Sequence, residues 1–336
     1  MSAQPLPTSG AGTLPEHPAE RRADRSILGS ATHRIATDRR RWLQLALAAI
    51  WIVDGLLQFQ PFMFTGGFAK MFVGIRGGSP DWILASIHWA WTVVAMNPIL
   101  TNTAFATLQV LLGVGIIWRR SLKLSLTVSI LWSLIVWWFG EDLGGLFSGD
   151  ASALSGAPGA VLLYAVLAAL LWPTERDTSR TFVAAQPVGP RVAKATWLVL
   201  WVGLAALNLQ PANLQPGSVS STVSAIGDGQ PAWLSALTNG FAGLSAHSGD
   251  FFALIGAVIM ALIGVGILVP ARWTRVTIAT AVTASAFIWL IGQALGALFG
   301  GTATDVNSGP LLAIIALAYW PVRPKAPSGV TQGTRT

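Results

Sequence analysis

Long apolar runs alternate with short polar segments along most of this chain. Residues 42–57, 104–118, 158–172 and 251–269 are runs with at most one charged residue each. With their flanks they approach the roughly 17–25 residues that a helix needs to cross the hydrocarbon core of a bilayer. The pattern therefore predicts an all-α integral membrane protein.

The apolar runs predict eight transmembrane helices arranged as two parallel four-helix repeats. The expected spans are residues 42–64, 101–118, 122–140, 158–173, 195–211, 250–269, 273–292 and 308–321. The expected organisation is a basic, disordered cytoplasmic tail (1–40), a first membrane repeat (41–173), a cytoplasmic linker (174–194), a second membrane repeat (195–321) and a second cytoplasmic tail (322–336). The first tail is rich in Pro, Ala, Ser and Arg and has no hydrophobic periodicity, which is typical of disorder.

The second half of the chain repeats the first. "PDW" at 80–82 aligns with "PAW" at 231–233, and "GVGI" at 113–116 aligns with "GVGI" at 264–267, both without a gap between them. Four spans are an even number, so both halves enter the membrane in the same orientation. The expected repeats are thus related by an axis along the membrane normal, unlike the inverted repeats of many transporters.

The distribution of charge gives an expected orientation. Of the 21 Lys and Arg residues, all except Lys70 and Arg76 fall in the tails, the linker or the two short turns on the same side. Such a bias marks the cytoplasmic side of a membrane protein. We therefore expect a plasma-membrane protein with both termini in the cytoplasm and the lipid bilayer as its surroundings. Since membrane sidedness accounts for the basic residues, the pI near 10.8 does not indicate a nucleic-acid partner.

Composition limits the chemistry. Charged residues are 10% of the chain, against about 25% in soluble domains. There is no cysteine, which excludes disulfides, thiol redox chemistry and thiolate metal sites. No pair of histidines is placed on facing spans, and no cofactor is expected.

One acidic residue lies inside the first span. Asp54 is followed one turn later by Gln58, on the same helix face, and then by Gln60. A carboxylate in hydrocarbon costs several kcal/mol, so it is usually paired, protonated or turned toward an internal cavity. The second half has Leu204 and Asn208 at the first two positions. A structural contact between helices and a proton, ion or ligand site both fit this pattern.

A second acidic feature ends the third span. Glu141 and Asp142 stand before two glycines, at a helix C-terminus where the helix dipole does not favour acids. The second half has neutral residues there, beginning with Gln293. The alternatives are a solvated helix end or an ionisable site kept by one half. The predicted polar site contains Asp54, Gln58, Gln60, Glu141 and Asp142, with Asn208, Gln210 and Gln293 from the second half.

The long outer connections, 65–100 and 212–249, are too apolar for simple loops. They predict interfacial or re-entrant helices rich in tryptophan. His88, His247 and Asp305 are the remaining candidate residues on the outer side. Asp305 lies in a loop of oxygen-bearing side chains, which predicts either an Asx turn before Pro310 or a cation site.

The segments "RRWLQLALAAIWIVDGLLQFQP" and "LLGVGIIWRRSLKLSLTVSIL" resemble the DoxX/DoxD-like four-helix membrane protein family, here in duplicate. The resemblance implies an accessory role in a membrane redox system, because some members are associated with quinone-linked sulfur oxidation or oxidative-stress complexes. The first functional hypothesis is accordingly an accessory or assembly subunit that binds other membrane protein subunits. The alternatives are a small-solute or ion transporter using a polar site between the two repeats, and an enzyme acting on a lipid or a quinone at the outer interface.

Overall fold

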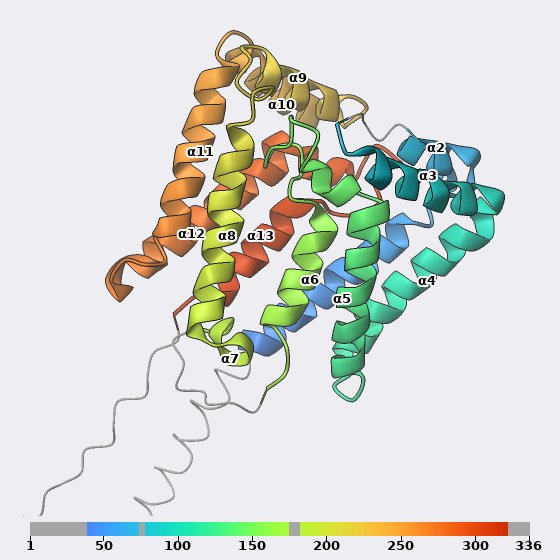
Figure 1. Ribbon diagram of the computed structural model, residues 1–336, viewed down its shortest axis with the longest axis horizontal. Coiled ribbons are helices and arrows are strands. Elements are labelled where there is room, and N and C mark those ends of the chain that lie inside the picture. Colours follow the sequence, from blue (N-terminus) through green and yellow to red (C-terminus); the bar gives the residue numbers. More distant parts are fainter. Residues whose placement is uncertain (1–38, 74–77, 175–181, 322–336) are drawn as a thin grey trace, which may run out of the picture.

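The computed structural model of the protein describes residues 39–73, 78–174 and 182–321 (Figure 1). Over these residues the chain is built from helices and contains no strand. The all-helical prediction is therefore confirmed. The predicted tail 322–336 and nearly all of the predicted tail 1–40 lie outside the described residues.

Six helices in the described part of the chain are at least 17 residues long. They are the first helix (39–57), α4 (Pro98–Ile117), α5 (Leu122–Phe139), α8 (Pro190–Asn208), α11 (Gly249–Val265) and α12 (Ala271–Phe287). Among the described residues, four segments are long and apolar enough to cross a membrane: α4, α5, α8 and Arg272–Gly292, which joins α12 to the turn after it. A fifth arises if α10 (Ala232–Ser245) and α11, which are bent by 104°, count as one broken span.

Two of the predicted spans, 158–173 and 308–321, contain helices that are too short to cross a membrane by themselves. α6 (Ala160–Leu170) and α13 (Ser308–Ala318) have 11 residues each, which is about 16 Å of helix against a hydrocarbon core of about 30 Å. Irregular segments precede both. We call them the first loop (141–159) and the second loop (293–307).

The two short helices form the centre of the molecule. α6 and α13 lie side by side and pack into one apolar core with the first helix and α8 (Figure 1). Aromatic rings dominate this core. The ring centroids of Trp51 and Tyr164 are 4.3 Å apart, those of Trp197 and Tyr319 are 4.8 Å apart, and both pairs are tilted. Large buried rings bring much apolar area into contact and prefer such tilted arrangements.

Part of the predicted linker is a packed element. The backbone N–H of Ala184 donates to the carbonyl of Ala318, at 2.9 Å, and residues 182–186 are buried. After the short α7 (Ala185–Val188), α8 begins at Pro190 and not at 195. Proline suits the first position of a helix, where its missing N–H costs nothing.

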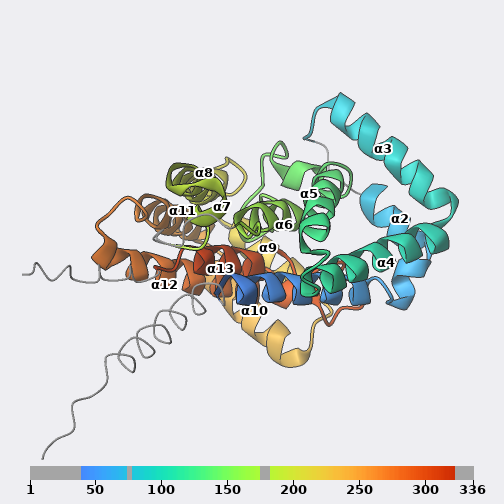
Figure 2. The same ribbon diagram turned by 90° about the horizontal axis from the view of Figure 1, so that it is seen from below.

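The molecule has two chemically different ends. The basic end contains α7, the turns after α4 and α11, and the first and last described residues (Figure 1). The loop end contains both loops and four helices (Figure 1): α2 (Gly66–Val73), α3 (Asp81–Met96), α9 (Ser218–Gly227) and α10. Arg41 donates to the Ile116 carbonyl at 2.9 Å, and Arg40 to that of Thr174 at 3.0 Å. Cations at helix C-termini are stabilising. In the turned view, α3 and α10 project from opposite sides of the molecule (Figure 2).

Candidate functional site

The two loops begin with the same backbone conformation. Leu143 and Gly144 have φ of 55° and 69°, and Leu295 and Gly296 have φ of 57° and 75°. In each pair the glycine lies against a carbonyl of the chain that leads into the next helix. These pairs belong to runs of four consecutive residues with positive φ, 142–145 and 294–297. Such a left-handed turn reverses the chain in a way that a helix-forming sequence does not predict. Each loop therefore turns back into the protein.

The side chain at the start of each loop binds the helix that follows it. The carboxylate of Glu141 accepts a hydrogen bond from the backbone N–H of Val161, in the first turn of α6, at 3.3 Å. Gln293 Oε1 accepts from the N–H of Gly309, in the first turn of α13, at 3.1 Å. The acid that ends α5 thus lies at the positive end of α6, where the helix dipole stabilises negative charge. This contact accounts for its unusual position in the sequence.

Glu141→Gln copies the residue that the second half has at Gln293. Its amide oxygen can still accept from the Val161 N–H, so we expect the variant to fold and to lose no more than about 1 kcal/mol of stability. Unfolding in mixed micelles measures the difference, and a variant that does not fold would contradict the match between the two contacts.

A polar cavity of about 420 Å³ opens between the two loops. Four carboxylates line it: Glu141, Asp142 and Asp150 from the first loop, and Asp305 from the second. No lysine or arginine occurs among the described residues that line it. Because acidic groups of both halves converge there, the cavity becomes more negative, and more attractive to cations, as these groups ionise. One of these carboxylates, Asp142, also has a partner outside the loops. The hydroxyl of Ser79, which lies between the first helix and α4 in the sequence, donates to it at 2.8 Å.

Asp54 lies beneath the loops and ties the two halves of the chain together. It is 1% exposed. The hydroxyl of Tyr164 in α6 donates to one of its oxygens, and the N–H of Val306 in the second loop donates to the other at 3.2 Å. Both carboxylate oxygens therefore have partners, as a buried acid requires.

The polar residues that end the first helix bind the loop of the opposite half. Gln58 Nε2 donates to the carbonyl of Thr304 at 3.4 Å, and Gln60 Nε2 donates to that of Ala303 at 2.9 Å. Both acceptors belong to the second loop, so the first helix is coupled to the second half at its polar end.

The same contact occurs in the opposite direction. Asn208, at the end of α8, accepts from the N–H of Ala153 at 3.1 Å, and Gln210 Nε2 donates to the carbonyl of Leu146 at 3.5 Å. Gln293 also reaches the first loop, donating to the Ala153 carbonyl at 3.2 Å. Each helix exit thus holds the loop of the other half by its backbone.

The predicted polar residues divide into two groups. Glu141, Asp142 and Asp305 line the cavity, whereas Asp54, Gln58, Gln60, Asn208, Gln210 and Gln293 position the loops around it. His88 and His247 are exposed on other segments and do not contact the cavity. Among the described residues, no group of three or more His, Cys, Asp or Glu is arranged to hold a metal ion.

Sequence reasoning missed two members of the site. Asp150 lines the cavity nine residues after Glu141, in the segment "SGD" that followed the predicted span. Tyr164 binds Asp54 from within α6. A signal for Tyr164 was available, because the chain has only two tyrosines and one of them interrupts an apolar helix. A phenol inside an apolar helix usually has a partner.

No protein-family model, curated protein or solved structure matches this chain. The resemblance to DoxX/DoxD-like proteins therefore stays a prediction.

Proposed function

We propose that the protein is a plasma-membrane protein of eight membrane-crossing segments in two parallel repeats, with both termini in the cytoplasm. In this arrangement α6 and α13 cross only part of the bilayer, and the two loops complete the crossing from the outer side. The matching conformations of the loops and their reciprocal contacts support a duplication. The arginines gathered at the basic end support its placement in the cytoplasm.

We further propose that the protein transports a small organic cation. The observation that carries this function is the cavity between the loops, where Glu141 and Asp142 of the first half converge with Asp305 of the second. A volume of about 420 Å³ is in the range of small-molecule sites. A protonated amine is the solute whose charge and size match such a site.

The interface between the halves offers a path for conformational change. In parallel-repeat transporters the substrate lies between halves that move against each other. Here the cavity is closed toward the basic end by the aromatic core around α6 and α13. Gln58 Oε1 and Gln210 Oε1 are buried at the contact between the halves without a hydrogen-bond partner in the described structure. A second arrangement of the halves would have these acceptors available for new bonds.

Equilibrium binding tests the cavity directly. We expect purified protein to bind radiolabelled tetramethylammonium saturably. Asp305→Asn should weaken the affinity at least tenfold, because it removes an ionisable group from the cavity. The variant keeps the side-chain oxygen that accepts from the Asn307 N–H at 2.7 Å. Asp250→Asn is the control, since Asp250 is an exposed acid at the same end. Equal affinities of wild type and Asp305→Asn would contradict the proposal.

The hypothesis of an accessory subunit in a redox system remains a prediction. Purification from native membranes in mild detergent tests it. Recovery in constant proportion with an oxidase, a dehydrogenase or a haem protein would support it, whereas a protein recovered alone would favour the transporter.

A further inference from the structure

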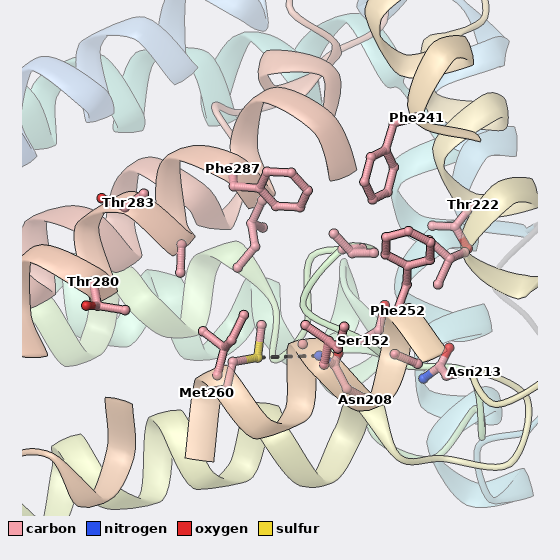
Figure 3. A pocket seen from close by; sticks show the side chains of 18 of the residues that line it. Ser152, Asn208, Asn213, Thr222, Phe241, Phe252, Met260, Thr280, Thr283 and Phe287 are labelled. Carbon is pink, nitrogen blue, oxygen red and sulfur yellow. Dashed lines mark hydrogen bonds between the residues drawn. The ribbon is translucent and has the colours of Figure 1, made fainter. Parts of the chain in front are cut away.

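A second cavity, of about 780 Å³, is lined mainly by residues of the second half (Figure 3). It extends between α11 and α12, with α9 and α10 at one end. Apolar and aromatic side chains line most of it, among them Phe241, Phe252 and Phe287. No charged side chain occurs among the described residues that line it.

Two small residues create this cavity. The alignment that matches the two "GVGI" segments places Gly256 where the first half has Phe105, and the alignment of Glu141 with Gln293 places Ala284 where it has Trp132. Phe105 and Trp132 fill the space between α4 and α5, with their ring centroids 5.0 Å apart. The second half has neither ring, and both small residues line the cavity.

The cavity is accessible from the side of the molecule that membrane helices present to lipid. Ile255 and Ile259 of α11 and Val276 of α12 line it and are also exposed, at 39%, 39% and 55%. α12 belongs to a candidate membrane span. In a bilayer the molecules next to this opening are lipids, so we expect a lipid acyl chain to occupy the apolar cavity.

A hydrogen-bond donor points into the apolar cavity. Asn208 is buried, and its Nδ2 has only the sulfur of Met260 as a described partner, at 3.5 Å (Figure 3). A thioether is a weak acceptor, so the donor is nearly unsatisfied. A lipid ester carbonyl would supply the missing acceptor.

The cavity continues at the loop end into a third one, of about 670 Å³, which has room for a headgroup. Asn213, Ser218 and Thr222 line both. The third cavity has polar walls that include Asp150, and its described lining residues contain no lysine or arginine. The Asp150 carboxyl group in these walls would disfavour an anionic headgroup, so a neutral or zwitterionic one fits better.

We propose that the second half binds one bilayer lipid in this cavity. The acyl chain lies between α11 and α12, the ester carbonyl accepts from Asn208, and an uncharged or zwitterionic headgroup lies in the third cavity. The acyl-chain cavity shares no described lining residue with the acidic cavity, whereas the third cavity shares Asp150, Ser155 and Asn307 with it. The binding of an acyl chain therefore does not depend on the transport of an organic cation.

Photo-crosslinking tests the lipid site. The full chain is reconstituted into phosphatidylethanolamine vesicles that contain a small fraction of phosphatidylethanolamine with a diazirine on its acyl chain. After illumination, the labelled peptides are mapped by mass spectrometry. We expect labelling to concentrate on the cavity-lining residues of α11 and α12, with at least fivefold less on α4 and α5. Unlabelled phosphatidylethanolamine should compete, and phosphatidylglycerol should compete weakly.

Filling the cavity should abolish the concentrated labelling. The double variant Gly256→Phe with Ala284→Trp copies the aromatic pair of the first half and is expected to reduce labelling on α11 and α12 at least fivefold. Gly256→Leu is the milder variant, because a Cβ at Gly256 meets only the flexible Asn208 amide, at 3.0 Å. Gly203→Phe is the control on α8, where an added Cβ meets nothing within 4 Å.

Two results would overturn the lipid site. One is even labelling of all exposed helices, which indicates bulk lipid only. The other is labelling that persists in both folded cavity variants. Equal competition by phosphatidylglycerol would overturn the assignment of the headgroup. None of these results bears on the binding of tetramethylammonium, so the two proposals fail separately.

Discussion

Gly144→Ala is expected to prevent the protein from folding. Gly144 has φ of +69°, a region that costs an L-residue about 1–2 kcal/mol. An alanine Cβ would also lie 1.9 Å from the Pro158 carbonyl oxygen and 2.2 Å from its carbon. These atoms are backbone, held at the entry of α6, and they have no alternative rotamer. The first loop must therefore move away from α6, and the hydrogen bond from Val161 to Glu141 is lost with it.

The neighbouring glycine is a matched control for this variant. Gly145 has the same φ of +69°, but a Cβ there meets only the Ser148 hydroxyl oxygen, at 3.4 Å. Gly145→Ala should therefore cost only the conformational term of about 1–2 kcal/mol. The yield of monodisperse protein in mild detergent and its melting temperature compare the two. If both variants behave alike, the close packing of the loop on α6 is wrong.

Asp54→Leu is the second variant with a large expected effect. It places in the first half the residue that the second half has at Leu204, and it leaves the Tyr164 hydroxyl and the Val306 N–H without their acceptor. An unsatisfied buried group costs about 1–3 kcal/mol, so we expect the free energy of unfolding to fall by about 2–5 kcal/mol. Reversible unfolding in mixed micelles measures this loss.

A second substitution should recover part of it. The alignment of the two Trp-Pro pairs that end the halves matches Tyr164 with Leu312, so Asp54→Leu with Tyr164→Leu makes the first half resemble the second. The double variant no longer buries a phenol without a partner. We expect it to be at least 1 kcal/mol more stable than the sum of the single effects predicts, because substitutions at two residues in contact do not have additive effects. Additive effects would contradict a direct Asp54–Tyr164 bond.

The helices of this fold could be predicted from the sequence, because their apolar runs need no partner to be recognised. The left-handed residues at the starts of α6 and α13 could not. The apolar pattern predicts the two helices within residues 158–173 and 308–321, but it does not predict the φ of 100° and 67° at their N-caps, Gly159 and Asn307. These conformations accompany two hydrogen bonds that no local pattern contains. Trp137 of α5 donates to the Pro158 carbonyl, and Trp289, in the turn after α12, donates to the Val306 carbonyl. The same contacts decide that residues after Phe139 turn back into the protein.

The candidate site was predicted in part for a related reason. Asp54, Glu141 and Asp142 stand out because charge inside or beside a span is costly. The meeting of Glu141 with Asp305 could not be predicted, because they are 164 residues apart and the second loop is brought there by bonds to Gln58 and Gln60. The cavity beside Gly256 becomes apparent only when the packing of the two halves is compared.

Flux across a membrane is the measurement that tests the proposed function most directly. Purified protein is reconstituted into liposomes, and uptake of radiolabelled tetramethylammonium is driven by an inside-negative potential. We predict saturable uptake by the wild type that Asp305→Asn reduces at least tenfold and Asp250→Asn leaves unchanged. Uptake no greater than in protein-free liposomes would contradict transport, and equal uptake by wild type and Asp305→Asn would contradict a substrate site between the two loops.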